Sequence, residues 1–230
     1  MFKVLTLFIV ITYVNISNAA GMIDDPLLTM VKVDQLELSD SDKNTWDAQA
    51  WIGKDLNKLW LKTEGELTSS DVEEAEIQLL YSRAIAPYWD AQIGWRHDLK
   101  PELNRDWLAV GVKGLAPYFF ETDIALFIGE HGNLGVRGQF EYELMLTQKW
   151  VLSPEIEVNL FSKNDENVGI GSGVSDISAG LRLRYEIKRE FAPYIGVEWN
   201  RRFGNTADFA QQEGESRTHV NWVAGVRILF

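Results

Sequence analysis

The chain has no cysteine among its 230 residues. An exported protein of this composition depends on no disulfide, and thiolate chemistry is excluded. Basic residues are in the minority, because 22 Lys and Arg stand against 34 Asp and Glu, for a net charge of −12. This balance argues against nucleic acid as a partner and favours cations near the protein.

Long hydrophobic runs are missing after the first twenty residues, and the mean hydropathy is −0.16. At the start of the chain, Lys3 precedes an apolar run over 4–14 and small residues at 17–20. This pattern is typical of a secretory signal peptide, since a membrane anchor needs about twenty apolar residues. We interpret 1–20 as a cleaved signal peptide, 21–29 as a short N-terminal segment and 30–230 as one domain.

The last twelve residues alternate between apolar and polar side chains. The apolar row comprises Val220, Trp222, Ala224, Val226, Ile228 and Phe230. His219, Asn221 and Arg227 fall in the other row, and period two places the two rows on opposite faces of a strand. An apolar outside, a polar inside and a terminal Phe indicate the last strand of an outer-membrane β-barrel, which must pair with the first strand because lipid tolerates no open edge.

Similar alternating segments separated by turn signals fill the domain. We predict twelve strands, near 30–38, 45–53, 57–67, 74–85, 88–99, 106–115, 118–129, 134–146, 150–162, 176–187, 194–203 and 218–230. The first alternates poorly. The predicted fold class is all-β, a closed antiparallel transmembrane β-barrel of about 12 strands. An even number of strands places both termini on one side, which we expect to be the periplasmic side of a bacterial outer membrane.

Repeated turn signals orient the predicted barrel. The tripeptide Ala-Pro-Tyr occurs at 86–88, 116–118 and 192–194, and Ser153-Pro154 occupies a similar place. Because proline is confined to turns, strand starts and edges, we expect short turns there, with each Tyr in an aromatic girdle. The alternate connections are longer and polar: 68–73, 99–105, 162–175 and 204–217. Short turns on one side and long loops on the other are typical of outer-membrane barrels.

The two faces of the predicted strands differ in charge. The apolar outer row has no charged residue, whereas the inner row has acids on strands seven to nine and arginines on strands ten to twelve, with Lys58 and Lys62 on strand three. We expect an acidic wall facing a basic wall, with the charges paired across a narrow lumen. Arg182, Arg184 and Arg227 should then pair with Glu141, Glu143, Glu155 or Glu157, directly or through water.

Five stretches of the chain are distinctive: Thr45–Glu66 (TWDAQAWIGKDLNKLWLKTEGE), Glu74–Asp90, Gly94–Asp98 (GWRHD), Gly114–Glu121 and Leu183–Val197. Together they resemble the copper resistance protein B family of outer-membrane proteins. The resemblance extends from Met22 to Phe230. It implies a barrel that serves copper tolerance, usually beside a periplasmic multicopper oxidase. Family members commonly carry a Met- and His-rich stretch before the barrel. Here only Met22 and Met30 remain, which does not favour bulk copper sequestration by an N-terminal tail.

Thioether and imidazole ligands select copper over harder cations, and few are present. Met145 shares its row with Glu141 and Glu143, and His219 opens the inner row of the last strand. His97 matches the family's motif, although parity turns it outward unless a bulge re-aims it. We predict Met145, His219 and His97 as the first copper ligands, with Met22 and Met30 as a separate capture point. The alternative is that Met145 fills space and the histidines lie at the rim.

Two classes of function remain open. One is a copper-handling barrel that binds or passes copper ions across the outer membrane. The other is a general small-solute or structural barrel without metal specificity. An enzyme is not expected, because no Ser-His pair held by a third group and no nucleotide-binding glycine fingerprint can be recognised.

Overall fold

The computed structural model describes residues 25–41, 43–68, 72–100 and 105–230. The predicted signal peptide and Met22 lie outside these residues. The strands of the described part are β1 (Leu28–Ser39), β2 (Lys43–Gly53), β3 (Asn57–Thr68), β4 (Val72–Ala86), β5 (Trp89–Lys100), β6 (Arg105–Ala116), β7 (Phe120–Gly129), β8 (Leu134–Glu141), β9 (Leu144–Met145), β10 (Trp150–Phe161), β11 (Gly173–Tyr185), β12 (Phe191–Arg202) and β13 (Thr218–Leu229).

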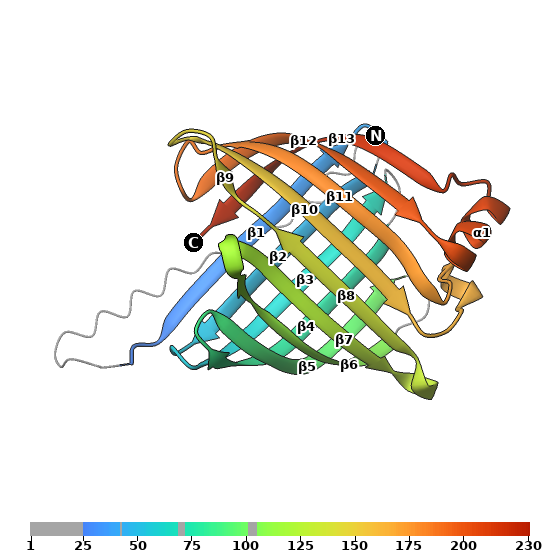
Figure 1. The fold of residues 1–230 in the computed structure, drawn as a ribbon, viewed down its shortest axis with the longest axis horizontal. Coiled ribbons are helices and arrows are strands. Elements are labelled where there is room, and N and C mark those ends of the chain that lie inside the picture. The colour runs from blue at the N-terminus through green and yellow to red at the C-terminus, as the bar shows by residue number, and fades with distance from the viewer. Residues whose placement is uncertain (1–24, 42, 69–71, 101–104) are drawn as a thin grey trace, which may run out of the picture.

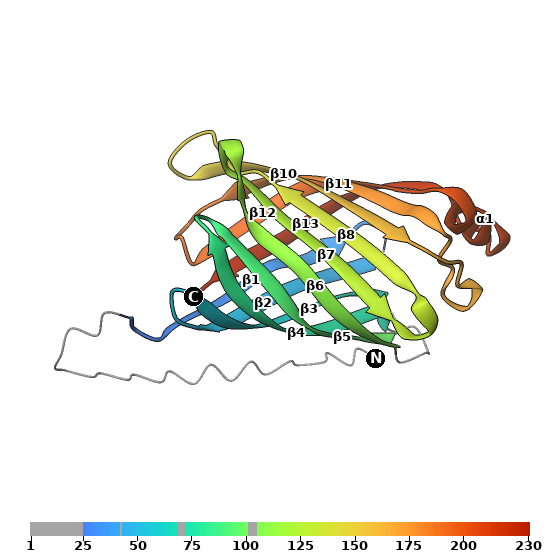
Figure 2. The same cartoon turned by 60° about the horizontal axis from the view of Figure 1, so that its bottom comes forward.

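These strands close into an antiparallel barrel, as predicted (Figures 1 and 2). Each strand pairs with its successor, and β13 returns to β1. Since β8 and β9 both pair with the same edge of β10, they form one interrupted strand, and the barrel has twelve. Val31 N donates to Phe230 O over 2.9 Å, so β1 begins where β13 ends. Within the described residues, no helix is long and apolar enough to cross a membrane.

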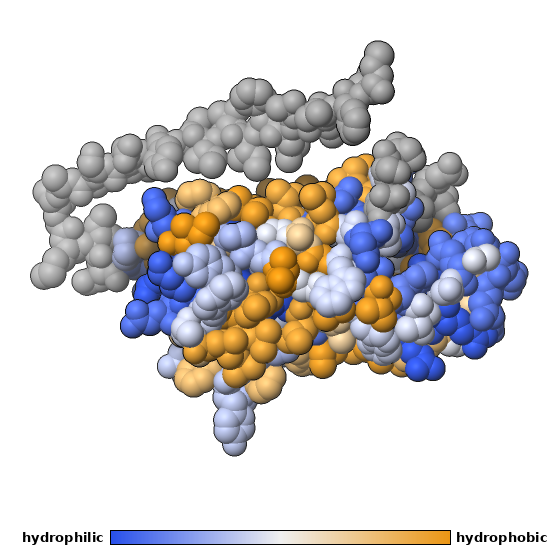
Figure 3. Space-filling model, turned by 90° about the horizontal axis from the view of Figure 1, so that it is seen from above, coloured by the Kyte–Doolittle hydropathy of each residue, from blue (hydrophilic) through white to orange (hydrophobic). Residues whose placement is uncertain are grey.

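The predicted outer row faces outward. Exposed apolar side chains follow every strand of the barrel, among them Ile52, Leu59, Leu61, Leu79, Ile93, Leu108, Val110, Ile124, Leu126, Ile156, Leu181, Ile195, Val220 and Trp222. Hydrophobic residues cover the middle of the barrel in Figure 3, and hydrophilic residues gather at the end that carries α1 (Gly204–Gln212). This surface suits a hydrocarbon layer, in which an exposed apolar side chain costs nothing.

A bulge explains why the first strand alternates poorly. The register of β1 shifts by one residue between Val33 and Gln35 against β2, and again between Val33 and Glu37 against β13. Both Lys32 and Glu37 are therefore buried in the lumen, although five positions separate them. One extra residue inverts the alternation of a strand beyond it.

Two of the predicted proline turns are wrong. Pro87 and Pro117 do occupy turns, and Tyr88 and Tyr118 after them are 77% and 83% exposed. In contrast, residues 192–194 lie inside β12, and Tyr194 is only 5% exposed. Pro193 is tolerated there because β12 pairs with β11 only from Tyr194 onward.

Ser153-Pro154 also lies inside a strand, β10, rather than in a turn. The strand beside it is interrupted at this level, where β8 ends at Glu141 and β9 starts at Leu144. Tyr142 N donates to Pro154 O over 3.0 Å, but proline has no N–H to return the bond. The proline therefore interrupts the ladder instead of ending the strand.

The connections fall into two sets. At the short-turn end they span 54–56, 87–88, 117–119, 146–149 and 186–190. At the opposite, long-loop end, the connections 162–172 and 203–217 are the long ones, and the second contains α1. The strands extend further than predicted around 68–73 and 99–105, so these two connections are shorter than expected, and 69–71 and 101–104 lie outside the described residues.

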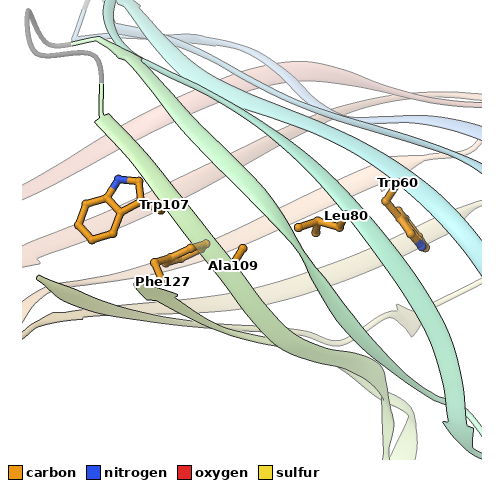
Figure 4. Packing of buried hydrophobic residues seen from close by; sticks show 5 residues of the cluster. All are labelled: Trp60, Leu80, Trp107, Ala109 and Phe127. Carbon is orange, nitrogen blue, oxygen red and sulfur yellow. The ribbon is translucent and has the colours of Figure 1, made fainter. Parts of the chain in front are cut away.

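A small apolar cluster occupies part of the lumen. Trp60, Leu80, Trp107, Ala109 and Phe127 are each at most 6% exposed and follow one another across β3 to β7 (Figure 4). Met30 and Trp51 pack against this cluster. The remaining lumen is polar, and it contains the candidate site.

Candidate functional site

Strand register determines which side chains share the lumen, because residues paired across neighbouring strands project from the same face. The predicted ion pairs are present. Arg182 Nη1 lies 2.6 Å from Glu155 Oε2, and Arg184 Nη2 lies 2.7 Å from Glu143 Oε1. Arg227 Nη1 lies 2.6 Å from the same Glu143 oxygen. The three arginines therefore make direct pairs with the predicted acids, as expected for guanidinium and carboxylate groups that share a narrow lumen.

The prediction of one acidic and one basic wall is wrong in detail. Arg137 lies on β8, within the predicted acidic wall, and Glu37 on β1 pairs with Arg182 on the predicted basic side. Lys113 on β6 adds another cation among acids, 3.3 Å from Asp123. The two signs are interleaved because each buried charge needs a partner within a few ångströms.

Two sets of ion pairs cross the lumen. Arg137 on β8 contacts Glu64 on β3, and its Nη2 lies 3.1 Å from Glu76 Oε2 on β4. Lys62 Nζ on β3 lies 2.7 Å from Asp123 Oδ2 on β7. These strands are four or five positions apart around the barrel. We call these contacts the cross-lumen pairs.

Described residues line two cavities in the lumen. The large cavity, of about 230 Å³, is lined by residues near the short-turn end, including Lys32, Glu121, Glu141 and Arg227. The small cavity, of about 40 Å³, is bordered by Arg137, Lys62 and other members of the cross-lumen pairs. Both cavities share Asp47, Gln49, Lys113, Asp123 and Gln139.

The predicted copper ligands are not brought together. Met30 is half-buried against the apolar cluster near the start of β1, opposite Trp51. Met145 keeps the predicted lumenal register, opposite Val151, but lies at the short-turn end and is 77% exposed. His219, the second residue of β13, lies opposite Asn200 at the long-loop end. Met22 lies outside the described residues.

His97 faces outward, as its parity predicts. Its Nδ1 lies 2.8 Å from Asp106 Oδ1, and its ring stacks on Trp95 with centroids 5.3 Å apart. The Trp95 indole donates to the same carboxylate oxygen over 2.8 Å. His97 is therefore held by its neighbours on the outer face, on the other side of the barrel wall from His219.

The atoms of the lumen that could bind a metal ion are mainly carboxylate and amide oxygens, rather than Met sulfur or His nitrogen. In the parts of the chain that the structure describes, no group of three or more His, Asp and Glu residues has the arrangement to hold a metal ion directly. A dehydrated copper ion therefore finds no ready-made cage of these residues there.

The long-loop end carries a compact assembly that the sequence did not predict. Thr206 of α1 is buried, and its hydroxyl accepts from Gly171 N over 2.8 Å and contacts Ser175 Oγ at 3.0 Å. A Cβ on Gly171 would lie 2.3 Å from Thr206 N, so this close approach requires glycine. In the same loop, a hydrogen bond from Arg202 lowers the pKa of Glu215.

Arg137 and Glu64 were not among the predicted lumenal residues, although their place in the alternating pattern indicates the lumen. Arg137 has the same parity as Gln139 and Glu141, and Glu64 the same parity as Lys62. Alternation alone could have placed both inward. Asp34 and Glu37 could not be placed in this way, because the bulge of β1 is not visible in the residue pattern.

Comparison with known proteins gives a consistent result. Residues 27–230 match the family described as "Copper resistance protein B precursor (CopB)". Copper resistance protein B of Escherichia coli is 46% identical over 210 residues, which cover 90% of this chain and 71% of that protein. A copper resistance protein B homolog of Pseudomonas syringae pv. tomato is 40% identical over 210 residues, with the same coverage of 90% and 71%.

Solved structures resemble the fold. The NanC porin has a TM-score of 0.55 at 11% identity, and the alignment covers 87% of this chain and 99% of that one. The KdgM porin in complex with disordered oligogalacturonate has a TM-score of 0.51 at 12% identity, with coverage of 87% and 99%. At these identities the likeness concerns the fold alone, which is that of an outer-membrane barrel.

Proposed function

Since this chain belongs to the copper resistance protein B family, we propose that it serves copper resistance by binding copper ions or passing them across the outer membrane. The observation that carries the proposal is the family match over residues 27–230, which includes every strand of the barrel. In this proposal, copper is the cargo of the barrel and not a resident cofactor.

The lumen supports this proposal through its charge. The residues that line the large cavity are mostly acids, amides, lysines and arginines, and the chain as a whole carries a net charge of −12. An acidic protein raises the local concentration of cations. Both termini are proposed to lie in the periplasm, where a multicopper oxidase would be the partner, and the outer apolar surface would contact membrane lipid.

A deletion strain tests the proposed function. We expect the strain to lose tolerance to copper while its tolerance to zinc and to antibiotics changes little. The intact gene should restore growth on copper. Equal sensitivity to all three agents, or none to any, would instead favour a general small-solute or structural barrel without metal specificity.

A further inference from the structure

Three glutamates stand side by side on the lumenal face. Glu121 on β7 is paired in register with Glu141 on β8, and Glu141 with Glu155 on β10. Like charges directly opposite each other on neighbouring strands are destabilising. Such a row therefore needs positive charge nearby to compensate the repulsion between its carboxylates.

The protein supplies that charge only in part. Glu155 contacts Arg182 at 2.6 Å and accepts from Gln35 Nε2 over 3.1 Å. The Arg184 guanidinium approaches Glu141 only to 4.0 Å. Within the described part of the chain, the Glu121 side chain makes no hydrogen bond or ion pair, although the Lys32 ammonium in the same cavity attracts both Glu121 and Glu141 without contacting either. The least compensated carboxylates of the row are therefore Glu121 and Glu141, which lack the short ion pair that Glu155 makes.

A cavity lies against this row. Glu121, Glu141 and Glu155 all line the large cavity of about 230 Å³. The Ser153 hydroxyl, from a side chain that is 3% exposed, also borders the cavity and has no hydrogen-bond partner in the described structure. A buried oxygen without a partner is costly unless water or a ligand satisfies it. It provides a second, neutral oxygen donor beside the carboxylates.

The size and spacing of the site indicate a hydrated ion. At about 30 Å³ for each water, the cavity has room for about seven to eight waters, enough for a divalent cation with a shell of six. Because no group of three or more of the described carboxylates is arranged to hold a metal directly, most of their contacts with the ion would pass through its waters. Soft ligands are absent from this row, and Met145, His97 and His219 lie elsewhere.

We propose that the large cavity binds a hydrated divalent cation through Glu121 and Glu141, and that copper occupies it as Cu(II) rather than Cu(I). Oxygen ligands suit divalent cations, among which Cu(II) binds most tightly, whereas Cu(I) selects thiolate and thioether ligands. The identity of the ion as copper rests on the proposed function. The existence of a divalent-cation site does not.

Manganese provides a probe of the site itself. The full chain, refolded in detergent micelles, is titrated with Mn²⁺ while the sharp EPR signal of the free aqueous ion is followed. We expect one Mn²⁺ to bind, and Cu(II) to displace it. Glu121→Gln should weaken binding of both ions by about tenfold, because one of the two charges facing the ion is lost. Glu121→Asp, which keeps the charge, should retain most of the affinity.

Two controls make the result specific. Glu190→Gln removes the same charge from an exposed turn at the same end of the barrel and should leave binding unchanged. Migration of unboiled samples on gels verifies folding, which Glu121→Gln should not disturb because Glu121 has no ion-pair partner. Wild-type affinity in folded Glu121→Gln and Glu141→Gln would overturn the proposal, as would an anaerobic Cu(I) titration that shows tighter binding than Cu(II).

The outcomes also separate this inference from the proposed function. A deletion strain with normal copper tolerance, together with Glu121-dependent Mn²⁺ binding, would reject copper resistance and retain the cation site. A copper-sensitive strain whose barrel binds Mn²⁺ and Cu(II) independently of Glu121 and Glu141 would retain copper resistance and reject this site.

Discussion

The outer and inner faces of one strand show how differently the two sides of this barrel are specified. On β3, Leu59 and Leu61 point outward and are 47% and 46% exposed, whereas Trp60 is 6% exposed inside. Lys62, also inside, reaches across the lumen to Asp123 on β7. The outer side chains face a uniform hydrocarbon layer, so any apolar residue serves. The inner ones each depend on a particular partner.

This difference teaches where the fold tolerates change. An outer apolar residue can be exchanged for another apolar residue at little cost, because lipid has no shape to match. A lumenal charge cannot be exchanged so freely, since its removal leaves the opposite charge without compensation. The strongest way to test the comparison is therefore to remove a lumenal charge that has several partners.

Replacing Arg137 with Ala should have the largest effect. The change removes the cation that contacts Glu64, Glu76 and Glu157, at a cost of about 3 kcal/mol, the lower end expected for a broken buried pair because these side chains are not fully buried. It should also widen the lumen and raise single-channel conductance in planar bilayers. Urea unfolding of the barrel in lipid vesicles measures the loss of stability.

The matched control for this change is Arg201→Ala. Arg201 is exposed near the end of β12 and lies over the Phe203 ring at 5.2 Å, so its loss should cost less than about 1 kcal/mol and leave conductance unchanged. If Arg137→Ala and Arg201→Ala are equally mild, the cross-lumen pairs do not stabilise the barrel.

Placing a charge on the outer face should have the next largest effect. Leu126, in the middle of β7, is exposed to the outside, and Leu126→Arg should cost about 2–4 kcal/mol because the guanidinium enters the middle of the bilayer. Leu134→Arg, at the end of β8, should cost only about 0–1 kcal/mol near the interface. Unfolding in vesicles compares the two, and equal costs would mean that β7 does not cross the hydrocarbon layer.

The same contrast explains how far sequence alone could lead. Strand number, the outer row and the three arginine pairs followed from alternation, because a strand's period of two is imposed by backbone geometry. Which acid each arginine meets across the lumen did not follow, as Arg137 with Glu64 and Glu76 shows. Such contacts depend on the circumference of the barrel and the stagger of its strands, which no local pattern encodes.

Local exceptions also escaped the pattern. The extra residue in β1 moved Glu37 into the lumen, and the nine-residue helix α1 formed within a predicted loop. For the copper ligands, residue type guided the prediction toward Met145, His219 and His97. The structure places these residues apart: Met145 at the short-turn end, His219 at the long-loop end and His97 on the outer face. Residue type alone does not distinguish the two ends or the two faces of a barrel.

Pro154→Ala should have the smallest effect on stability. Since Tyr142 N donates to Pro154 O, the missing N–H of Pro154 faces the interruption between β8 and β9. Alanine would supply this donor and let the ladder continue. The new hydrogen bond would contribute about 0.5–1.5 kcal/mol, offset by about 0.4–1 kcal/mol from the freer unfolded chain. The net change in stability should therefore be less than about 1 kcal/mol.

Hydrogen exchange can detect this local change in strand pairing even where the free energy of unfolding hardly changes. In Pro154→Ala, the amides of residues 142–144 should exchange more slowly than in the parent chain, because they gain a continuous partner strand. Pro193→Ala is the control, since Pro193 lies where β12 has only β13 beside it and no interrupted neighbour can be repaired. Unchanged exchange at 142–144 would mean that the proline does not cause the interruption. The repulsion between Glu141 and Glu155, which end the regular pairing of β8 with β10, would then be its cause.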